Sequence, residues 1–384
     1  MILSYKCKIN IDKEQSEQLI KVLHFNNFIC NIIAQKAFES QVFKQFDIHK
    51  FVYYSIRQEY NVKSQQLVKC IAKVADQFKI QKGTAPISKS LCMDYDNRNL
   101  NINLIDKTIS FSPNDSDNNY KFKLNIDIHP RIDLDQKIQN SYKICYENKN
   151  FYLIIFQNKE EKTIITHPKS IGIDLGINTI ATLSTGHIFG SKKLNFINKK
   201  YRAIRSKLQS RNTKSSKRKL IKLSRKLSNF TKNMNHVISK KIVSLAKAHN
   251  SNLVLEDLKY IRIKSTVTKA KPLIAKLNKW SFSQLRSFIE YKSSLAGVHL
   301  QIVKAHFTSQ CCSKCGFTNK LNRQTQACFK CIQCGYTLNA DLNASINLSR
   351  KFVYATVNSL KVSFNKTETT SFETLSRHEV FKAS

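Results

Sequence analysis

The sequence is poor in the residues and patterns that mark several common protein classes. Its 384 residues include only 8 Gly and 5 Pro, which excludes the collagen-like and low-complexity classes. No GxGxxG or Walker A spacing occurs, so the usual signatures of nucleotide-binding enzymes are absent. No apolar run approaches the ~18 residues that span a membrane, and the charged start MILSYKCKINIDKEQ does not resemble a signal peptide. We therefore expect a soluble intracellular protein.

Acidic residues are scarce as well. The chain has 26 Asp and Glu against 64 Lys and Arg, a formal net charge of +38, and residues 175–255 hold 19 Lys or Arg and no acid. A surface of this kind favours a polyanionic partner such as nucleic acid. A carboxylate weakens binding to a phosphate backbone unless a cation lies between them. The five acids of residues 171–345 are therefore candidates for a special role: Asp174, Glu256, Asp257, Glu290 and Asp341.

In the N-terminal half of the chain, the pattern of apolar residues changes from helical to strand-like near residue 84. Residues 1–10 alternate like a strand, Asp12 is a candidate N-cap, and helical periodicity follows, with further helical stretches at about 48–61 and 63–80. From about 84 to 168, short alternating segments are separated by Asn, Asp, Ser and Pro clusters, which is typical of a small β-barrel.

A third segment, with a mixed pattern of strands and helices, begins at Ser170. The pattern predicts three strands, a basic helical region at about 195–249, the strand SNLVLEDL, a helix ending at Gly297, a strand, and a final helix that Asn339 caps. This is the element order of an RNase H-like α/β fold, with a cysteine cluster inserted before the last helix. Residues from about 356 onward are rich in Ser, Thr and Asn, and we expect a disordered tail.

Three of the five acids stand where an RNase H-like fold would gather them. Asp174 is expected in the middle of the first strand, Asp341 in the first turn of the last helix, and either Glu256 or Asp257 at the end of the fourth strand. The residues alone do not choose between Glu256 and Asp257. Three carboxylates at one end of the sheet would hold two Mg²⁺ ions for an in-line phosphodiester displacement. Glu290 lies one turn after Arg286, so a surface ion pair is the better interpretation there.

Six of the 11 Cys residues lie between positions 311 and 334. Two CxxC-Gly knuckles with fifteen residues between them predict a zinc ribbon that binds one structural Zn²⁺. Cys328 also stands three residues before Cys331, but Gly316 and Gly335, which follow the second Cys of each knuckle, favour the first register. The predicted ligands are Cys312, Cys315, Cys331 and Cys334. Cys311 and Cys328 are left over, and the other five Cys are expected to be buried apolar residues.

The segments GIDLGINTIATLSTG, LVLEDL and FTSQCCSKCG…FKCIQCGYTLNADLNASINL resemble the TnpB family, whose relatives include Fanzor proteins and small type V CRISPR effectors. The resemblance implies an RNA-guided DNA endonuclease with a RuvC domain and the catalytic carboxylates Asp174, Glu256 and Asp341, and so favours Glu256 over Asp257. It also implies a domain layout: a wedge-like barrel at 1–11 and 84–168, a helical recognition domain at 12–83, a RuvC domain at 169–306 and 338–355, a zinc-ribbon target-nucleic-acid-binding insert at 307–337, and a tail at 356–384.

The resemblance further implies the partners: a guide RNA made from the element's own end and a double-stranded DNA target beside a short adjacent motif, bound by a monomeric ribonucleoprotein. The basic run from Lys192 to Lys226 is a candidate wall of the nucleic-acid channel. The expected nucleic-acid contacts are Tyr53, Lys73 and Gln77 near the adjacent motif, and Arg202, Arg205, Lys207, Arg211, Lys217 and Arg218 in the basic run.

Three alternative functions fit the same residues. A small type V CRISPR effector would differ in its genomic context. A guide-independent RNase H-like transposase would produce strand-transfer products. A non-cleaving RNA- or DNA-binding regulator would not need Asp174.

Overall fold

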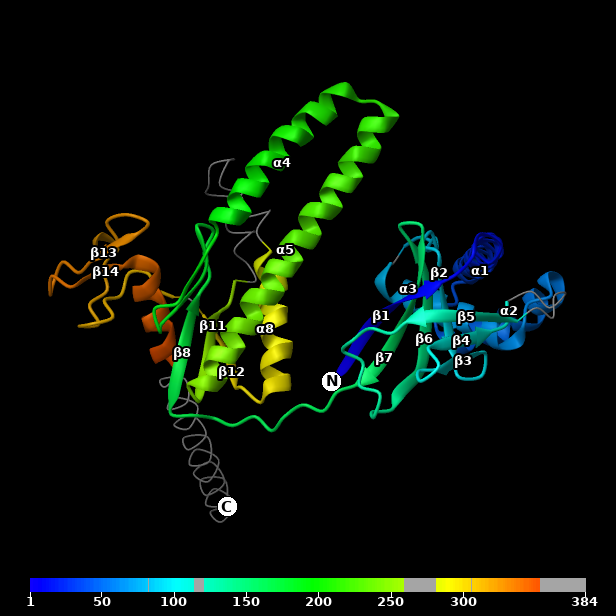
Figure 1. The fold of residues 1–384 in the computed structure, drawn as a ribbon, viewed down its shortest axis with the longest axis horizontal. Helices are drawn as coiled ribbons and strands as arrows, with labels where there is room; N and C mark the ends of the chain where they lie inside the picture. The colour runs from blue at the N-terminus through cyan, green and yellow to red at the C-terminus, as the bar shows by residue number, and fades with distance from the viewer. Residues whose placement is uncertain (82, 114–120, 259–280, 305, 353–384) are drawn as a thin grey trace, which may run out of the picture. The chain divides into compact units, whose positions relative to one another are not determined.

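The computed structural model describes residues 1–81, 83–113, 121–258, 281–304 and 306–352 (Figure 1). The chain divides into two compact units, Met1–Glu160 and Glu161–Ser384, and each is described by itself. The tail expected at 356–384 lies outside the described residues. Within the described part, no helix is both long and apolar enough to cross a membrane.

The first unit is built on a nearly closed antiparallel sheet. Its seven strands are β1 (Ile2–Asn10), β2 (Cys92–Asp96), β3 (Leu100–Asn103), β4 (Thr108–Phe111), β5 (Phe122–Asp127), β6 (Ile138–Glu147) and β7 (Asn150–Asn158). They pair in the order β2-β6-β7-β1-β5-β4-β3, so the N-terminal strand lies in the middle. The apolar residues on one face of each strand form the barrel core, which includes Tyr95, Phe111 and Phe122.

Three helices complete the first unit: α1 (Lys13–Glu39), α2 (Gln45–Tyr60) and α3 (Ser64–Ile80). Asp12 caps α1 as expected, because its carboxylate accepts a hydrogen bond from Gln15 N–H at 2.8 Å. The first half of α1 packs on the barrel core through Leu19 and Leu23, and its second half packs on α2 and α3. The helix therefore belongs to both cores and joins them.

The second unit contains a five-stranded mixed sheet. Its strands are β8 (Lys169–Asp174), β9 (Thr179–Leu183), β10 (Ile188–Gly190), β11 (Ser251–Glu256) and β12 (Leu300–Val303), in the order β10-β9-β8-β11-β12. β8, β9 and β10 pair antiparallel, and β11 runs parallel to both β8 and β12. Asp174 is the last residue of β8, not its middle as expected, because the chain turns through Leu175–Asn178 directly afterwards.

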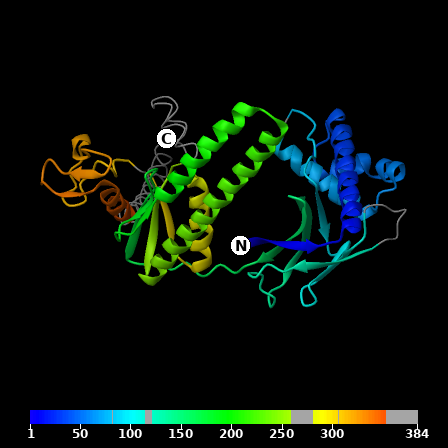
Figure 2. The same ribbon diagram turned by 45° about the horizontal axis from the view of Figure 1, so that its top comes forward.

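Helices cover the two faces of this sheet. One face carries α5 (Lys214–Ala248) and α8 (Phe282–Ala296), whose apolar residues share a core with Ile171, Ile173 and Leu255. α4 (Lys192–Arg211) and the first half of α5 form a long antiparallel hairpin that extends beyond the sheet (Figures 1 and 2). The single helical region expected at 195–249 is thus two helices, which separate at Asn212 in the left-handed conformation.

The segment between β12 and the last described helix is a small cysteine-rich insert. It contains a short 3-10 helix, η1 (Lys320–Asn322), and a two-stranded ribbon of β13 (Cys328–Lys330) and β14 (Thr337–Asn339). β14 leads directly into a helix at 340–352, which we call the C-terminal helix. Through this connection the insert leads to the end of the sheet at which β8 and β11 finish.

Candidate carboxylate and four-cysteine sites

Asp174 and Glu256 stand at the ends of two neighbouring parallel strands. The register pairs Ile173 of β8 with Leu255 of β11, and each acid is the next residue of its strand. Ile173 and Leu255 point into the core under α5 and α8. Because successive side chains of a strand alternate between faces, Asp174 and Glu256 share the opposite face. Glu256 Oε1 also accepts a hydrogen bond from Leu175 N–H at 3.4 Å.

The C-terminal helix packs on this second face and carries the third acid. Gly172, two residues before Asp174, makes room for it: a Cβ there would lie 2.0 Å from Ser345 O. Ser170 Oγ, on the same face, donates to Ser349 O at 2.7 Å. Asn339 Oδ1 caps the helix by accepting from the backbone N–H of Asp341 at 3.0 Å, which fixes Asp341 in the first turn.

The three carboxylates interact electrostatically. Burial, together with the charge of Asp341, raises the pKa of Asp174 to about 7. Burial, together with the charges of Asp174 and Asp341, raises the pKa of Glu256 to about 8, although the Leu175 N–H opposes the shift. Mutual repulsion in a buried place disfavours the ionised forms. A divalent cation would relieve this repulsion, and carboxylate oxygens are the ligands that Mg²⁺ takes.

Two cations lie beside the carboxylates, and sequence reasoning missed both. Arg323 Nη2, from the cysteine-rich insert, lies 3.3 Å from Asp341 Oδ1, and its charge also lowers the pKa of Asp174. Lys351 Nζ donates to the carbonyl oxygens of Lys304 and His306 at 2.9 and 2.7 Å, and its charge acts on Glu256. No spacing in the sequence identifies Arg323, because the fold of the insert alone brings it to Asp341.

Asp257 and Glu290 have a common partner outside this group. Arg286 of α8 binds Asp257 Oδ1 through Nη1 and Glu290 Oε1 through Nε, both at 2.8 Å. The ion pair expected between Arg286 and Glu290 is therefore confirmed. Glu256 faces Asp174, whereas Asp257 faces Arg286, so the neighbouring acids that the sequence could not separate have different surroundings.

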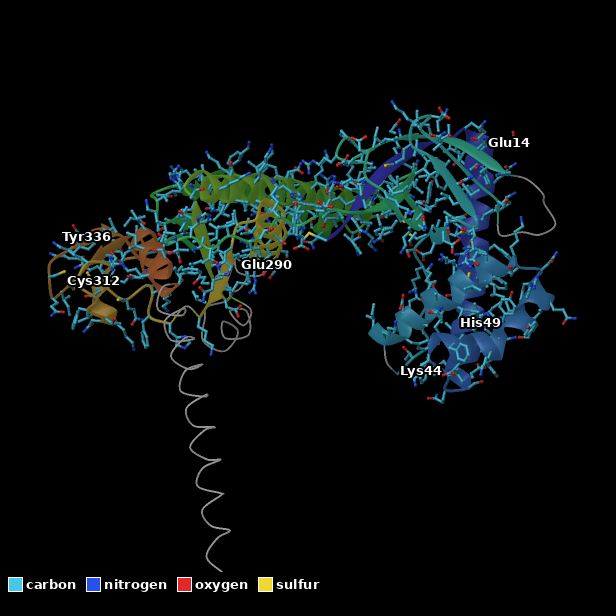
Figure 3. The ribbon with its side chains drawn as sticks, turned by 90° about the horizontal axis from the view of Figure 1, so that it is seen from below. Glu14, Lys44, His49, Glu290, Cys312 and Tyr336 are labelled. Carbon is cyan, nitrogen blue, oxygen red and sulfur yellow. The ribbon has the colours of Figure 1, made fainter. Side chains whose placement is uncertain are left out.

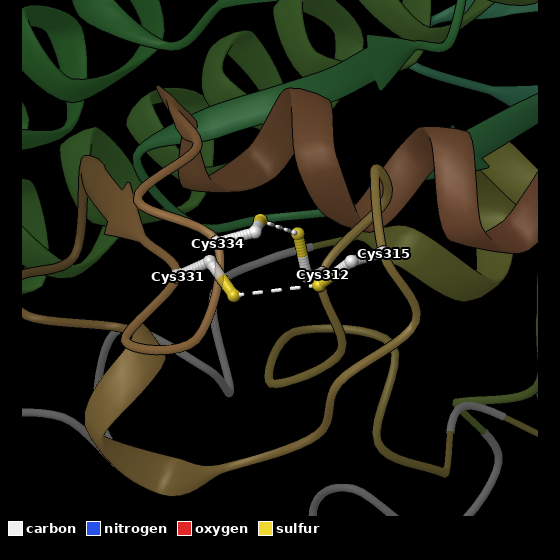
Figure 4. Close-up of side chains that lie close together, drawn as sticks. All are labelled: Cys312, Cys315, Cys331 and Cys334. Carbon is white, nitrogen blue, oxygen red and sulfur yellow. Dashed lines mark hydrogen bonds between the residues drawn. The ribbon is translucent and has the colours of Figure 1, made fainter.

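The two CxxC knuckles bring four cysteines together (Figure 4). The Sγ atoms of Cys312, Cys315, Cys331 and Cys334 all lie within 4.8 Å of one another, with 3.7 Å between Cys312 and Cys334 and 3.6 Å between Cys315 and Cys331. Zn–S bonds of about 2.3 Å in a tetrahedron place sulfur atoms roughly 3.8 Å apart. The cluster therefore has the donor set and the dimensions of a structural zinc site.

The knuckle turns and the neighbouring thiols also set the acidity of two of the cysteines. Gly316 and Gly335 have φ of 81° and 70°, the left-handed conformation that glycine adopts most readily. Burial raises the pKa of the Cys331 thiol, but the N–H groups of Cys334 and Gln333 and the adjacent thiols bring it down to about 7. The N–H of Phe317 lowers the pKa of Cys315, but burial and the adjacent thiols outweigh it and raise the pKa to about 12. Because the ligand of zinc is the thiolate, a bound Zn²⁺ would displace the proton of Cys315.

The other two cysteines of the insert lie outside the cluster. Cys311 Sγ donates to Gly316 O at 3.3 Å, and Cys328 is exposed on β13. The insert also has a small core of its own, in which Tyr336 packs beside Cys312 and Phe329. Figure 3 labels Tyr336 and Cys312, which both belong to the insert.

The expected nucleic-acid contacts of the basic run lie on the α4–α5 hairpin. Arg205 is half-buried, and the other five are exposed: Arg202, Lys207, Arg211, Lys217 and Arg218. Leu194 is the one residue of α4 that is buried. With no acid between 175 and 255, the charged side chains of the hairpin are all basic, although Phe196, Ile204 and Ile221 are exposed among them.

The three contacts expected in the first unit lie in two different places. Lys73 and Gln77 are on α3 and already have polar partners, since Lys73 Nζ donates to Cys92 O at 3.0 Å and Gln77 Nε2 donates to Ser88 Oγ at 3.1 Å. Tyr53 is on α2, where its ring stacks on His49 with 4.5 Å between the centroids. Their roles in nucleic-acid binding stay predictions.

Comparisons with known proteins find two family models that match segments of the chain. Residues 144–262 match the OrfB_IS605 model, described as "Probable transposase", and residues 282–348 match the model "Cas12f1-like, TNB domain". The latter range contains the four-cysteine cluster and Asp341. In these two segments the chain is similar to TnpB/OrfB_IS605 proteins and to the TNB domain of Cas12f1-like proteins.

Its relatives are distant. It is 27% identical over 349 residues to the CRISPR-associated endodeoxyribonuclease Cas12f1 of Sulfoacidibacillus thermotolerans, covering 79% of this chain and 81% of that protein. It is 37% identical over 116 residues to the TnpB-like protein MJ0751 of Methanocaldococcus jannaschii, covering 30% and 41%. It is 30% identical over 218 residues to the putative RNA-guided DNA endonuclease InsQ of Escherichia coli K12, covering 51% and 53%.

The fold as a whole is similar to that of Cas12f1. The structure of a Cas12f1–sgRNA–target DNA complex aligns with a TM-score of 0.64 and 15% identity, covering 88% of this chain and 83% of that one. The chain therefore has a mixed α/β, Cas12f-like fold, in which the nearly closed barrel sheet and the four-cysteine cluster both take part.

Proposed function

We propose that the protein is an RNA-guided DNA endonuclease of the TnpB type, which hydrolyses phosphodiester bonds at Asp174, Glu256 and Asp341. The observation that supports this proposal is the electrostatic coupling of these carboxylates: Asp174 and Glu256 end neighbouring parallel strands, and the charge of Asp341 helps to raise the pKa of both. The strand order β10-β9-β8-β11-β12, with three antiparallel strands followed by two parallel ones, supports an RNase H-like (RuvC) nuclease domain.

The two proposed metals have different tasks. Asp174, Glu256 and Asp341 would hold Mg²⁺, which when bound supplies an activated water and stabilises the leaving oxygen. The four cysteines would hold one Zn²⁺ that keeps the insert folded, and with it Arg323 near Asp341. The chain's own residues orient the carboxylates: the β8–β11 register sets two of them, and the Asn339 cap sets the third.

The proposed partners are a guide RNA and a DNA target. Relatives named as RNA-guided endonucleases and a structural neighbour bound to sgRNA and target DNA support them. So does the acid-free α4–α5 hairpin, because an RNA–DNA heteroduplex is held through its backbone phosphates. The proposed layout assigns the barrel to the wedge domain, the helices at 12–83 to the recognition domain, and residues 307–337 to the target-nucleic-acid-binding insert.

The second candidate is a small type V CRISPR effector, favoured by the Cas12f1-like match of residues 282–348 and by the extent of the Cas12f1 alignment. The site chemistry is the same for both candidates, and they differ in the source of the guide. RNA that copurifies with the protein, expressed with its native flanking DNA, separates them. An RNA that runs past the end of the element supports the TnpB type, and one with CRISPR repeat sequence supports the effector. A heterogeneous cellular RNA contradicts both.

The cleavage test uses neighbouring acids as matched variants. Asp174→Asn and Glu256→Gln should abolish cleavage of a plasmid that matches the copurified guide, while RNA and DNA binding persist. Asp257→Asn is the control, because its carboxylate faces Arg286, which keeps Glu290 as a partner. If Glu256→Gln cleaves normally and Asp257→Asn does not, the proposed site is wrong. Strand-transfer products would indicate a transposase instead.

A further inference from the structure

A pair of cysteines in the first unit has no part in the proposed nuclease chemistry. Cys92 is the first residue of β2, an edge strand of the seven-stranded sheet, and it lies directly opposite Cys145 of β6. Met93 and Ile144, the next residues along the two strands, point into the barrel core. Both cysteines therefore lie on the other face of the sheet, side by side.

The backbone geometry at this pair suits a disulfide. Tyr146 N–H donates to Leu91 O at 2.8 Å, so the adjacent pair Cys92–Cys145 is of the non-hydrogen-bonded kind. Cα atoms in such pairs are about 4.5 Å apart. Disulfides join Cα atoms that are roughly 4.4 to 6.8 Å apart, so the bond needs no large movement of either strand.

The two thiols differ in accessibility and acidity. Cys92 is partly exposed, whereas Cys145 is buried with 2% of its surface accessible. A hydrogen bond with Cys145 and the charges of Lys73 and Lys143 lower the pKa of the Cys92 thiol to about 7, although burial opposes the shift. The same hydrogen bond, with burial, raises the pKa of Cys145. Near neutral pH, Cys92 is therefore an accessible nucleophile with a protonated thiol beside it.

A second cysteine pair provides a contrast. Cys30 of α1 and Cys70 of α3 also interact, but their exposed fractions are 0% and 1%, and Cys70 Sγ donates to Asn26 Oδ1 at 3.0 Å. An external oxidant reaches a thiol only where the sulfur is accessible. Both sulfur atoms of the Cys30–Cys70 pair are buried, whereas Cys92 of the other pair is partly exposed. An external oxidant should therefore react with Cys92 and not with Cys30 or Cys70.

We propose that Cys92 and Cys145 form a reactive dithiol, which a low-molecular-weight disulfide such as oxidised glutathione converts into an intrachain disulfide. The Cys92 thiolate attacks one sulfur of the oxidant, whose S–S bond breaks and releases one glutathione thiolate. Cys145 then loses its proton and attacks the Cys92 sulfur of the mixed disulfide, which releases the second glutathione. The protein loses two electrons and two protons, and the oxidant becomes two reduced thiols.

The test uses the full-length, zinc-loaded protein in glutathione buffers of rising oxidised-to-reduced ratio. After acid quenching and alkylation of the remaining thiols, digestion without reductant and mass spectrometry identify the linked peptides. A Cys92–Cys145 link that dithiothreitol removes is expected. The bond closes the loop from 92 to 145, so the oxidised protein should also have a higher thermal midpoint for its first unit.

Three variants test the order of the steps. In Cys145→Ser the reaction should stop at the mixed disulfide between glutathione and Cys92. In Cys92→Ser, Cys145 should remain unmodified. Cys30→Ser is the control and should form the Cys92–Cys145 link like the wild type. The proposal fails if Cys92 and Cys145 remain open to alkylation in buffers that oxidise the cysteines of the insert. It also fails if the wild type stops at the mixed disulfide, or if the linked peptides contain Cys30 and Cys70.

Discussion

Gly172 gives the sharpest test of how the carboxylate site is assembled. It lies two residues before Asp174, on the face of β8 that the C-terminal helix covers. A Cβ at this position would lie 2.0 Å from Ser345 O and 2.5 Å from Ser349 N, whereas real Cβ contacts essentially never fall below 3.0 Å. Both neighbours are backbone atoms that cannot rotate away. Gly172→Ala must therefore push the helix that carries Asp341 away from Asp174 by roughly 1 Å.

This displacement should lower both the stability of the second unit and the rate of cleavage. Overpacking of a well-packed contact costs about 1–3 kcal/mol, and a backbone clash of this depth should lie near 3 kcal/mol. A misplacement of roughly 1 Å at a reacting centre can cost about 100-fold in rate. We therefore expect urea unfolding of the second unit at a lower midpoint, and cleavage of a guide-matched plasmid reduced about 100-fold at saturating Mg²⁺.

Gly190→Ala is the matched control, because a Cβ at Gly190 would meet no atom within 4 Å and its φ is not positive. This variant should unfold and cleave like the wild type. Zinc content, measured in parallel, should be unchanged in both variants, since the four cysteines lie in the insert. If Gly172→Ala keeps the wild-type midpoint and cleavage rate, close packing of the C-terminal helix does not position Asp341, and the assembly described above is wrong.

Three further predictions concern the zinc, the first unit and the hairpin. Cys331→Ser should lower the bound zinc, measured by elemental analysis, below one ion per chain and expose the insert to proteolysis, and full zinc retention would contradict the assignment. Burial raises the pKa of Asp96, but Arg98 and Lys69 outweigh it and hold the pKa at about 2. Because the folded pKa is depressed, the stabilisation, about 2.6 kcal/mol, should be complete above the unfolded pKa of about 3.9 and lost as the pH falls toward 2. Urea unfolding against pH should show this loss in the wild type and not in Asp96→Asn. Lys217→Ala with Arg218→Ala should flatten the logarithmic salt dependence of nucleic-acid binding by roughly one unit per lost phosphate contact, and an unchanged slope would place the hairpin outside the interface.

Local signals in the sequence were sufficient for much of the fold. Asp12 and Asn339 cap helices where expected, and Gly297 ends α8 in the left-handed conformation with φ of 73°. The four cysteines meet because each knuckle carries its own turn glycine. All of these features depend on residues within a few positions of one another, where spacing determines geometry.

Features that depend on packing between distant segments could not be predicted. The different surroundings of Glu256 and Asp257 follow from the register of β11 on β8, and a shift of one residue would exchange their faces. Arg323 approaches Asp341 only because the folded insert places them together. The hydrogen bonds of Lys73 and Gln77 to the segment at 88–92 likewise require α3 to pack beside β2.

The distribution of acids is explained most fully when the sequence and the structure are combined. Of the five acids between 171 and 345, three form the carboxylate group, and the other two share Arg286. Under the proposed function none of the five adds an uncompensated negative charge to the basic surface, because bound cations would neutralise the first three and the last two already face a guanidinium. A chain that must lie along phosphates can keep a carboxylate only under those conditions. Under the proposed function, the scarcity of acids and the clustering of those that remain have one physical cause, which is the repulsion between a carboxylate and a phosphate backbone.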